Sequence, residues 1–99
     1  MSYSRKLSTL LVSAQLNPGM TNGDVERVLN RAKDWCRFGP RAWIVVTTQP
    51  PTIWRGRLQH LTDPAGELFI CRMDLSQNAG SMPEGFWDWV NKWKAIDAS

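Results

Sequence analysis

Four arginines are the side chains whose type and spacing best suit the binding of an anion. Arg37 and Arg41 lie on either side of a predicted turn, and Arg55 and Arg57 follow further along the chain, two residues apart. The planar guanidinium group binds phosphate oxygens through paired hydrogen bonds, which a lysine ammonium group cannot reproduce. These four arginines are therefore the predicted nucleic-acid contacts. The alternative is that they are ordinary solvated surface charges, because acidic residues are interspersed among them.

Tryptophan is unusually frequent, and half of it gathers near the C-terminus. The chain has six tryptophans, of which Trp87, Trp89 and Trp93 fall within seven residues. Tryptophan is enriched among the residues that dominate binding at protein interfaces. We therefore predict that these three residues cover a partner, with a homodimer as the expected assembly. The alternative is that the segment packs across its own domain and buries most of the indole surface.

No catalytic or metal-binding motif is recognisable. His60 is the only histidine, and Cys36 and Cys71 are far apart in the sequence, so no zinc site of known spacing can be assembled. Asp74, which follows a predicted strand, is the one carboxylate with the position to suggest a metal role. Phosphate-binding glycine loops are also missing. We predict no metal, no cofactor and no catalytic residue, although an enzymatic activity is left open.

The composition is that of one globular domain. The chain has 99 residues, of which 42% are hydrophobic and 21% are charged. This length is enough for one domain spanning residues 1–99 and too short for two. The net charge of +3 favours polyanions slightly but is not a nucleic-acid signature by itself.

The sequence also sets expectations about location. No apolar run is long enough to cross a membrane, so we expect a soluble, cytoplasmic protein with no membrane partner. Arg5 and Lys6 precede a short apolar run, but hydroxyl residues interrupt that run too soon for a signal peptide. In the cytoplasm Cys36 and Cys71 are expected as reduced, buried thiols, and a disulfide between them is the alternative.

The first half of the chain predicts a strand and then a helix. Leu7 to Leu16 form an apolar run that Asn17-Pro18-Gly19 ends abruptly. Thr21 and Asp24 then have the spacing of a capping box at a helix start. The apolar residues that follow recur with the period of an α-helix, at Val25, Val28, Leu29 and Ala32.

A β-hairpin is predicted next. Ala42 to Thr48 are dense in β-branched residues and give the strongest strand signal of the chain. Gly39-Pro40 marks the turn before this strand, so Trp35 to Phe38 are interpreted as a short edge strand. The alternative, in which Trp35 to Phe38 prolong the preceding helix, stays open.

The remaining elements are two helices and a strand. A second helix is predicted from Pro51 to Leu61, a strand from Glu67 to Met73, and a last helix that begins at Pro83-Glu84. On this last helix one apolar stripe is expected, with Trp87 and Trp89 pointing elsewhere. The stripe consists of Phe86, Val90 and Trp93.

This order of elements specifies an α+β fold. The succession β-α-β-β-α-β predicts a ferredoxin-like sandwich, one antiparallel sheet backed by two helices, with an additional C-terminal helix. The expected strand order is 4-1-3-2. Leu10 to Val12 and Ile44 to Val46 should lie in its two central strands.

Several segments carry a family resemblance. Five segments resemble parts of one group of proteins. Val12 to Gly19 resemble the end of the group's first strand, and Trp43 to Thr47 resemble its third strand. Arg57 to Asp63 resemble its second helix, Glu67 to Ile70 its fourth strand, and Phe86 to Val90 its aromatic ending. That group is the SinR-like, CRISPR-associated small proteins. It is related in fold to the ferredoxin-like small subunit of CRISPR adaptation complexes.

The resemblance implies a homodimer, and it also implies a function that involves nucleic acid. Some proteins of the wider group bind or cut nucleic acid, using a metal ion held by an Asp at the end of the first strand. Gln15 stands at the corresponding position here. Because a neutral amide cannot supply the anionic oxygen that Mg²⁺ prefers, this difference argues against nuclease activity.

Three functions follow, in order of preference. The first is a non-catalytic homodimer that associates with nucleic acid or a nucleoprotein complex, for which the resemblance implies a defence-related role. The second is a protein-interaction module or inhibitor from a mobile element, which binds a protein partner through its Trp-rich surface. The third is a metal-dependent nuclease.

Overall fold

The structure, a computed structural model, describes residues 6–96. The predicted domain of residues 1–99 therefore has its two ends, Arg5 included, outside the described residues. The elements run along the chain as β1 (Ser8–Gln15), α1 (Asn22–Leu29), β2 (Asp34–Gly39), β3 (Ala42–Thr47), α2 (Pro51–Leu58), the 3-10 turn η1 (Gln59–Leu61), β4 (Glu67–Met73), α3 (Glu84–Trp93) and the 3-10 turn η2 (Lys94–Ile96).

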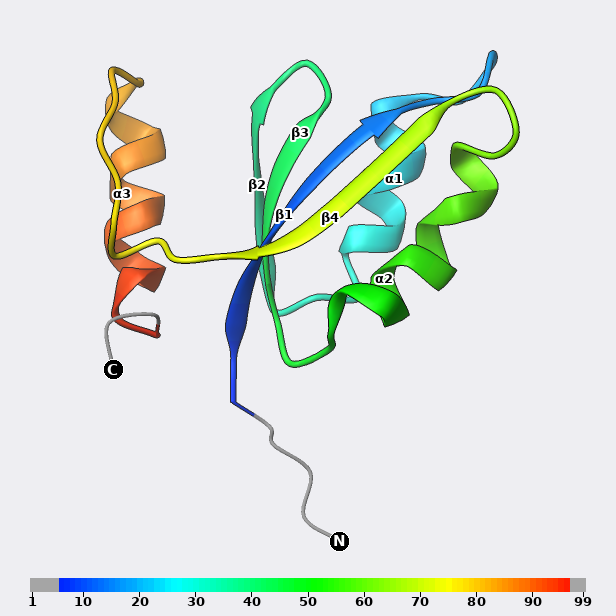
Figure 1. The fold of residues 1–99 in the computed structure, drawn as a ribbon. Helices are drawn as coiled ribbons and strands as arrows, with labels where there is room; N and C mark the ends of the chain where they lie inside the picture. The colour runs from blue at the N-terminus through cyan, green and yellow to red at the C-terminus, as the bar shows by residue number, and fades with distance from the viewer. Residues whose placement is uncertain (1–5, 97–99) are drawn as a thin grey trace, which may run out of the picture.

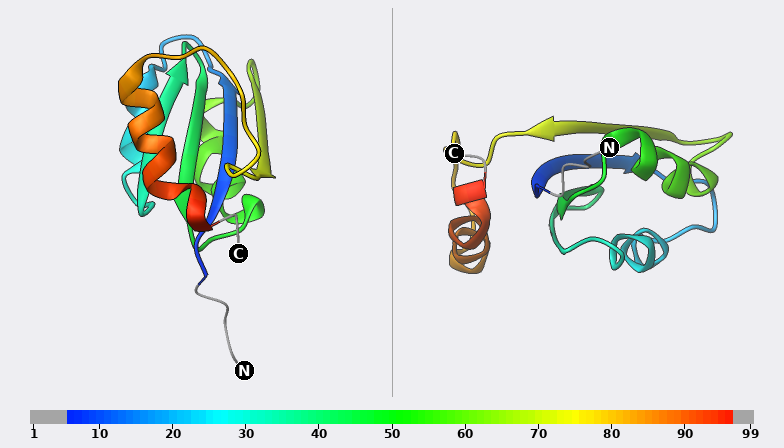
Figure 2. Two further views of the ribbon diagram at one scale, coloured as in Figure 1. Left: turned by 90° about the vertical axis from the view of Figure 1, so that its left-hand side faces the viewer. Right: turned by 90° about the horizontal axis from the view of Figure 1, so that it is seen from below.

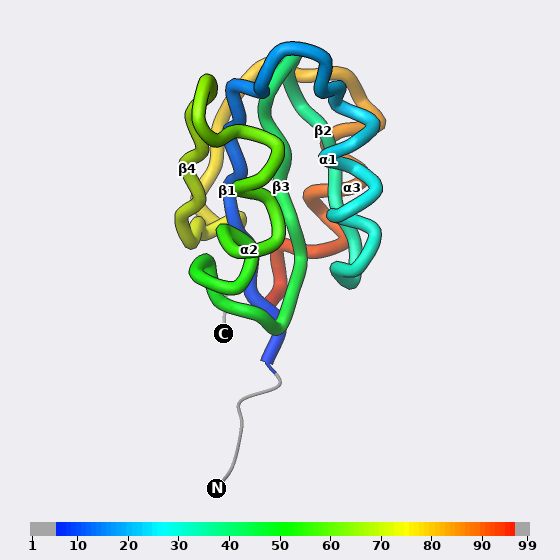
Figure 3. The backbone as a smooth tube through the Cα atoms, turned by 90° about the vertical axis from the view of Figure 1, so that its right-hand side faces the viewer, coloured from blue at the N-terminus to red at the C-terminus, as the bar shows by residue number. Residues whose placement is uncertain are grey.

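One antiparallel sheet organises the molecule. Its four strands lie in the order β2-β3-β1-β4, and every neighbouring pair is antiparallel. Helices α1 and α2 lie side by side over one face, while α3 stands over the other (Figures 1 and 3). The predicted α+β, ferredoxin-like class with an extra C-terminal helix is confirmed, and the strand order matches the expected one.

The main core lies between the sheet and helices α1 and α2. Alternate residues of β1 point to this face, so Leu10, Val12 and Ala14 are buried there, whereas Leu11, Ser13 and Gln15 on the other face are partly buried or exposed. Opposite them, Val25 and Leu29 of α1 and the buried side of α2 close the core. Trp43 and Trp54 are its largest members, and both are fully buried.

Local sequence signals explain where the elements begin and end. Thr21 caps α1 through the predicted capping box, because its hydroxyl accepts from the Asp24 N–H and the Asp24 carboxylate accepts from the Thr21 N–H at 2.8 Å. The hairpin interpretation of Trp35 to Phe38 is confirmed by β2. The second helix is shorter than predicted, since its α-helical part ends at Leu58 and η1 continues the chain to Leu61.

The loop before β4 is tied to the end of β1. The Asn17 side chain accepts from the Ala65 N–H at 3.0 Å and donates to the Asp63 carbonyl oxygen. Gly66 lies so close to β1 that a Cβ atom there would be 1.8 Å from the Gln15 carbonyl oxygen. Only glycine fits this position, and the contact fixes where β4 starts.

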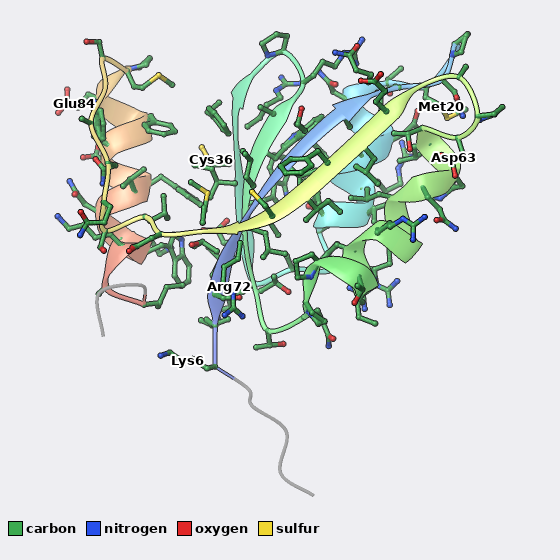
Figure 4. The ribbon with its side chains drawn as sticks, viewed as in Figure 1. Lys6, Met20, Cys36, Asp63, Arg72 and Glu84 are labelled. Carbon is green, nitrogen blue, oxygen red and sulfur yellow. The ribbon has the colours of Figure 1, made fainter. Side chains whose placement is uncertain are left out.

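The two cysteines lie on the sheet face that α3 partly covers. The register places Cys36, Ile44, Leu11 and Cys71 in one row across the four strands. Three strand spacings, about 14 Å, separate the two sulfur-bearing residues, whereas a disulfide needs Cα atoms within about 7 Å. Both thiols are free and half-buried, and burial, followed by the Asp34 charge, raises the pKa of Cys36. Figure 4 shows Cys36 between the sheet and α3.

A second, smaller cluster attaches α3 to the sheet. Ile44, Leu75 and Val90 form its buried centre. Five further side chains of α3 and β2 pack around them, and Met73 adds to the cluster from β4. Within residues 6–96, no helix is long and apolar enough to cross a membrane.

Candidate nucleic-acid interface

The four predicted arginines are spread over the molecule rather than gathered. Arg37 lies 3.5 Å from Glu26, measured between Nε and Oε2, and Arg41 donates from Nη1 to Asn22 Oδ1 at 2.8 Å. Both therefore have partners on α1, next to the hairpin. Arg55 and Arg57 are both on α2, but two residues of a helix differ by about 200° in direction. Each consequently lines a different hollow.

A basic hollow lies between α1 and α2, and we call it the interhelical hollow. It has a volume of about 510 Å³. Arg27 lines it from α1 and Arg31 from the turn just after α1, while Arg57 and His60 line it from α2 and η1. Figure 3 shows the two helices side by side over the sheet.

Two of these guanidinium groups, those of Arg31 and Arg57, repel each other and have no ion-pair partner in the described residues. Burial and then repulsion from Arg31 lower the pKa of Arg57 below its ordinary value. Within residues 6–96 neither of these arginines forms an ion pair, since the salt bridges there involve Arg27 and Arg37. The Arg57 guanidinium also lies 4.7 Å from the centre of the Trp54 ring, a cation–π contact that holds it in place. An anion placed between Arg31 and Arg57 would relieve their repulsion.

The carboxylate of this hollow is already engaged. Asp24 pairs with Arg27 at 3.1 Å and accepts the Thr21 N–H. That backbone hydrogen bond, then the Thr21 hydroxyl and Arg27, lower the pKa of Asp24. Asp24 therefore stays ionised and neutralises Arg27, which leaves the Arg31 and Arg57 charges for a ligand.

A second hollow, the edge hollow, lies on the other side of α2 along the outer edge of β4. Its volume is about 270 Å³. Arg55 lines it together with the first turn of α2 and the middle of β4, contributed by Pro51, Thr52, Leu68, Phe69 and Ile70. Arg55 is the only charged residue of this lining.

The three C-terminal tryptophans form hydrogen bonds to other residues of the same chain. The indole N–H groups of Trp89 and Trp93 donate to the same oxygen of Asp34, Oδ2, at 3.0 and 2.8 Å. Trp87 donates to the Met82 carbonyl oxygen at 3.1 Å. The prediction that Trp87 and Trp89 point away from the apolar stripe is wrong, because both pack against the same cluster as Trp93. Their role at a partner interface stays a prediction.

The residues considered for metal chemistry have other contacts. Asp74 accepts from the N–H and the hydroxyl of Ser76, at 2.9 and 2.6 Å, which is an ordinary turn. Gln15 is exposed at the end of β1 and pairs with Glu67 across the strands. In the described part of the chain no three His, Cys, Asp or Glu side chains gather closely enough to hold a metal ion.

Sequence reasoning missed Arg27, Arg31 and Asp34. Arg27 is on α1, and Arg31 follows four residues later, in the turn just after that helix. This spacing was readable, but their meeting with Arg57 depends on how α1 packs beside α2. No sequence pattern indicated the role of Asp34, because its two indole donors are more than fifty residues away in the sequence.

The chain matches no protein-family model, no curated protein and no solved structure.

Proposed function

We propose that this protein binds nucleic acid without catalysis and holds phosphate groups between α1 and α2. The observation that carries the proposal is the pair Arg31 and Arg57, two neighbouring guanidinium groups that line one hollow and have no carboxylate partner in residues 6–96. Keeping two like charges together costs free energy unless an anion neutralises them. A phosphate group has the charge and the acceptor geometry for this position.

The surroundings favour a polymer over a single small anion. The interhelical hollow is open and shallow enough for charged groups to reach it, and Arg55 extends the positive charge to the other side of α2. The net charge of +3 adds a weak attraction at long range. A backbone that carries a phosphate at every nucleotide can contact several of these groups together.

The test is a fluorescence-anisotropy titration with duplex DNA, single-stranded DNA and RNA at low and at physiological salt. The wild-type protein is expected to bind with an affinity that falls as salt rises. The double variant Arg31→Gln/Arg57→Gln should reduce the slope of log K against log salt concentration by about one to two, since each phosphate contact contributes about 0.7 to 0.9. Absence of binding at low salt would contradict the proposal.

A matched control separates a specific site from the loss of positive charge. Lys94 lies in η2, next to α3 and on the other face of the sheet, and is exposed. Lys94→Gln removes one positive charge, as Arg31→Gln or Arg57→Gln does alone, and it should leave the affinity and the salt slope nearly unchanged. If it weakens binding as much as each arginine substitution does, then the interhelical hollow is not the site.

A protein partner is the second candidate function, and one hollow favours it. Between β2 and α3 lies a mostly apolar hollow with a volume of about 460 Å³, lined by Phe38, Phe86, Trp89 and Met82, with Arg37 also in its lining. Aromatic and methionine side chains of this kind are enriched at protein interfaces. A second copy of the chain is the partner expected here. Sedimentation equilibrium should then give a dimer for the wild type and a monomer for Phe38→Ala, whereas a monomeric wild type would contradict this candidate.

A further inference from the structure

Phe69 is the most exposed large apolar side chain that the structure describes. It lies in the middle of β4 and is 62% exposed, against 41% for Ile53 and 39% for Met20. Its neighbour across the strands is Ser13, which is too small to cover an aromatic ring. Full burial of a phenylalanine would stabilise the fold relative to exposure. Because the Phe69 side chain is exposed, the fold lacks that stabilisation at this position.

The rest of the structure leaves this part of the sheet uncovered. α3 lies over the β2 side, and β4 is the strand at the opposite edge (Figures 1 and 2). Glu67 to Ile70 form the first half of β4, which is the half that lies farther from α3 (Figure 1). An occupant could therefore approach Phe69 from the open face and from the outer edge of the sheet.

The edge hollow beside Phe69 is positive. Arg55 is its only charged lining residue, and the remaining lining is mostly apolar. Glu67 lies two residues before Phe69 and shares its face of the sheet, so a negative ligand would keep to the Arg55 side. At about 270 Å³ the hollow is smaller than the range of roughly 300 to 1,000 Å³ that drug-sized ligands occupy. It suits a group of the size of a nucleobase.

A second copy fits this edge poorly. Two β4 strands paired edge to edge would merge their hollows and bring the Arg55 groups of both copies together. Charged side chains at a sheet edge are a common means of preventing such pairing. An anionic occupant meets no such repulsion.

We infer that an unpaired base of single-stranded nucleic acid stacks on Phe69 while Arg55 contacts an adjacent phosphate. The inference rests on the proposed function and names its ligand class. Every base has a π-face, so an exposed aromatic ring beside a cationic groove binds single strands with little dependence on sequence. Bases of a duplex are already stacked and paired, and they are not free to occupy this position. The strand would pass from Arg31 and Arg57 across α2 to Arg55 and Phe69.

The experiment compares two labelled probes, an oligothymidine of about ten nucleotides, within the usual site size, and a duplex of the same length. The wild type should bind the oligothymidine more tightly than the duplex. Phe69→Leu should weaken binding of the oligothymidine by about five- to a hundredfold, the range found for loss of one stacked base, and leave duplex binding unchanged. Phe69→Tyr keeps the ring and should retain the affinity.

Two further variants complete the design. Arg55→Gln should weaken oligothymidine binding and reduce its salt slope by about 0.7, one single-strand phosphate contact, while Lys94→Gln serves as the charge control. Because Phe69 and Arg55 are exposed, the thermal midpoints of these variants should stay close to the wild-type value.

The outcomes separate this inference from the proposed function. If Phe69→Leu binds oligothymidine as the wild type does, while Arg31→Gln/Arg57→Gln weakens both probes, the stacking site is wrong and the proposed function stands. If the wild type binds neither probe at low salt, both are wrong. If Phe69→Leu turns a dimer into a monomer in sedimentation equilibrium without a change in affinity, the occupant is a second copy and the inference is overturned.

Discussion

The two faces of the sheet are covered by different physical means. On one face, α1 and α2 bury a continuous set of aliphatic and indole side chains, ten of which are nearly inaccessible to solvent. On the other face, α3 covers only the β2 side, and only three residues of its cluster are buried to that extent. The first face is held mainly by apolar area removed from water. The second depends on a few directed contacts.

The contact that matters most on the second face is polar. Asp34 at the start of β2 accepts one hydrogen bond from each of two indole groups of α3, and its other oxygen accepts from the Trp35 N–H at 2.9 Å. Within residues 6–96 no cation pairs with it. One carboxylate can therefore position a helix on a sheet where the buried apolar area is small. Such a helix should also be the first part of the fold to open.

Neighbouring leucines on β1 give the largest test of this comparison. Leu10 is fully buried on the α1/α2 face, whereas Leu11 is half-buried on the face that α3 partly covers. Leu10→Ala should reduce the free energy of unfolding by about 3 kcal/mol, within the usual range for a buried leucine. Leu11→Ala should cost about 1 kcal/mol, because less surface and a smaller cavity are involved. Urea denaturation measures both, and equal losses would contradict the comparison.

The next test removes the carboxylate that holds α3. Asp34→Ala deprives two half-buried indole groups of their acceptor, and hydrogen bonds to a charged group contribute about 1.5 to 3 kcal/mol each when they are fully formed. Since the site is partly exposed, we expect a total loss of about 2 kcal/mol. The loss should be local to α3. Limited proteolysis should therefore cut residues 74–83 faster in this variant, while the hydrogen exchange of β1 and β3 stays slow.

A carboxylate on the exposed side of α3 provides the control. Asp88→Ala also removes one negative charge, in this case from α3 itself, and Asp88 is exposed. It should leave the proteolysis rate close to that of the wild type. A similar acceleration in both variants would mean that overall charge, and not the Asp34 contacts, holds α3.

The fold could be predicted because its signals are local. The capping box at Thr21, the β-branched run of β3 and the exact bounds of β4 each arise from residues that are adjacent in the sequence. The periodicity of two and of 3.6 residues then assigns each element to its face. The end of α2 was missed by one turn, because the change from α-helix to η1 leaves no mark in the apolar pattern.

The candidate site was only partly predictable, since it is made by distant parts of the chain. Arg57 was predicted, but Arg27 and Arg31 come from α1 and from the turn after it, and only the packing of α1 beside α2 joins the three. The orientation of Trp89 was readable from the sequence, because it lies three residues after Phe86 and four before Trp93, spacings that place side chains on one side of a helix. Its shared acceptor was not readable, because Asp34, which accepts from the indole N–H groups of Trp89 and Trp93, is distant in the sequence.

The smallest test concerns how helices on the two faces begin. α1 has a capping box, whereas α3 starts at Pro83 without a side-chain cap. Thr21→Ala should therefore cost about 1 kcal/mol, and Thr21→Ser should cost much less because it keeps the hydroxyl. Urea denaturation at neutral pH measures both variants. A neutral result for Thr21→Ala would mean that packing against the sheet alone positions α1.

The same cap predicts a dependence on pH. Hydrogen bonds from Thr21 lower the pKa of Asp24 in the folded chain below its ordinary value of 3.8. The cap therefore stabilises the fold fully above that ordinary value, and the contribution is lost as the pH falls through the lower, folded pKa. Asp24→Asn removes the titrating group, so its stability difference from the wild type should be present at neutral pH and shrink in acid. A difference that stays constant with pH would show that Asp24 contributes to the start of α1 by its shape and not by its charge.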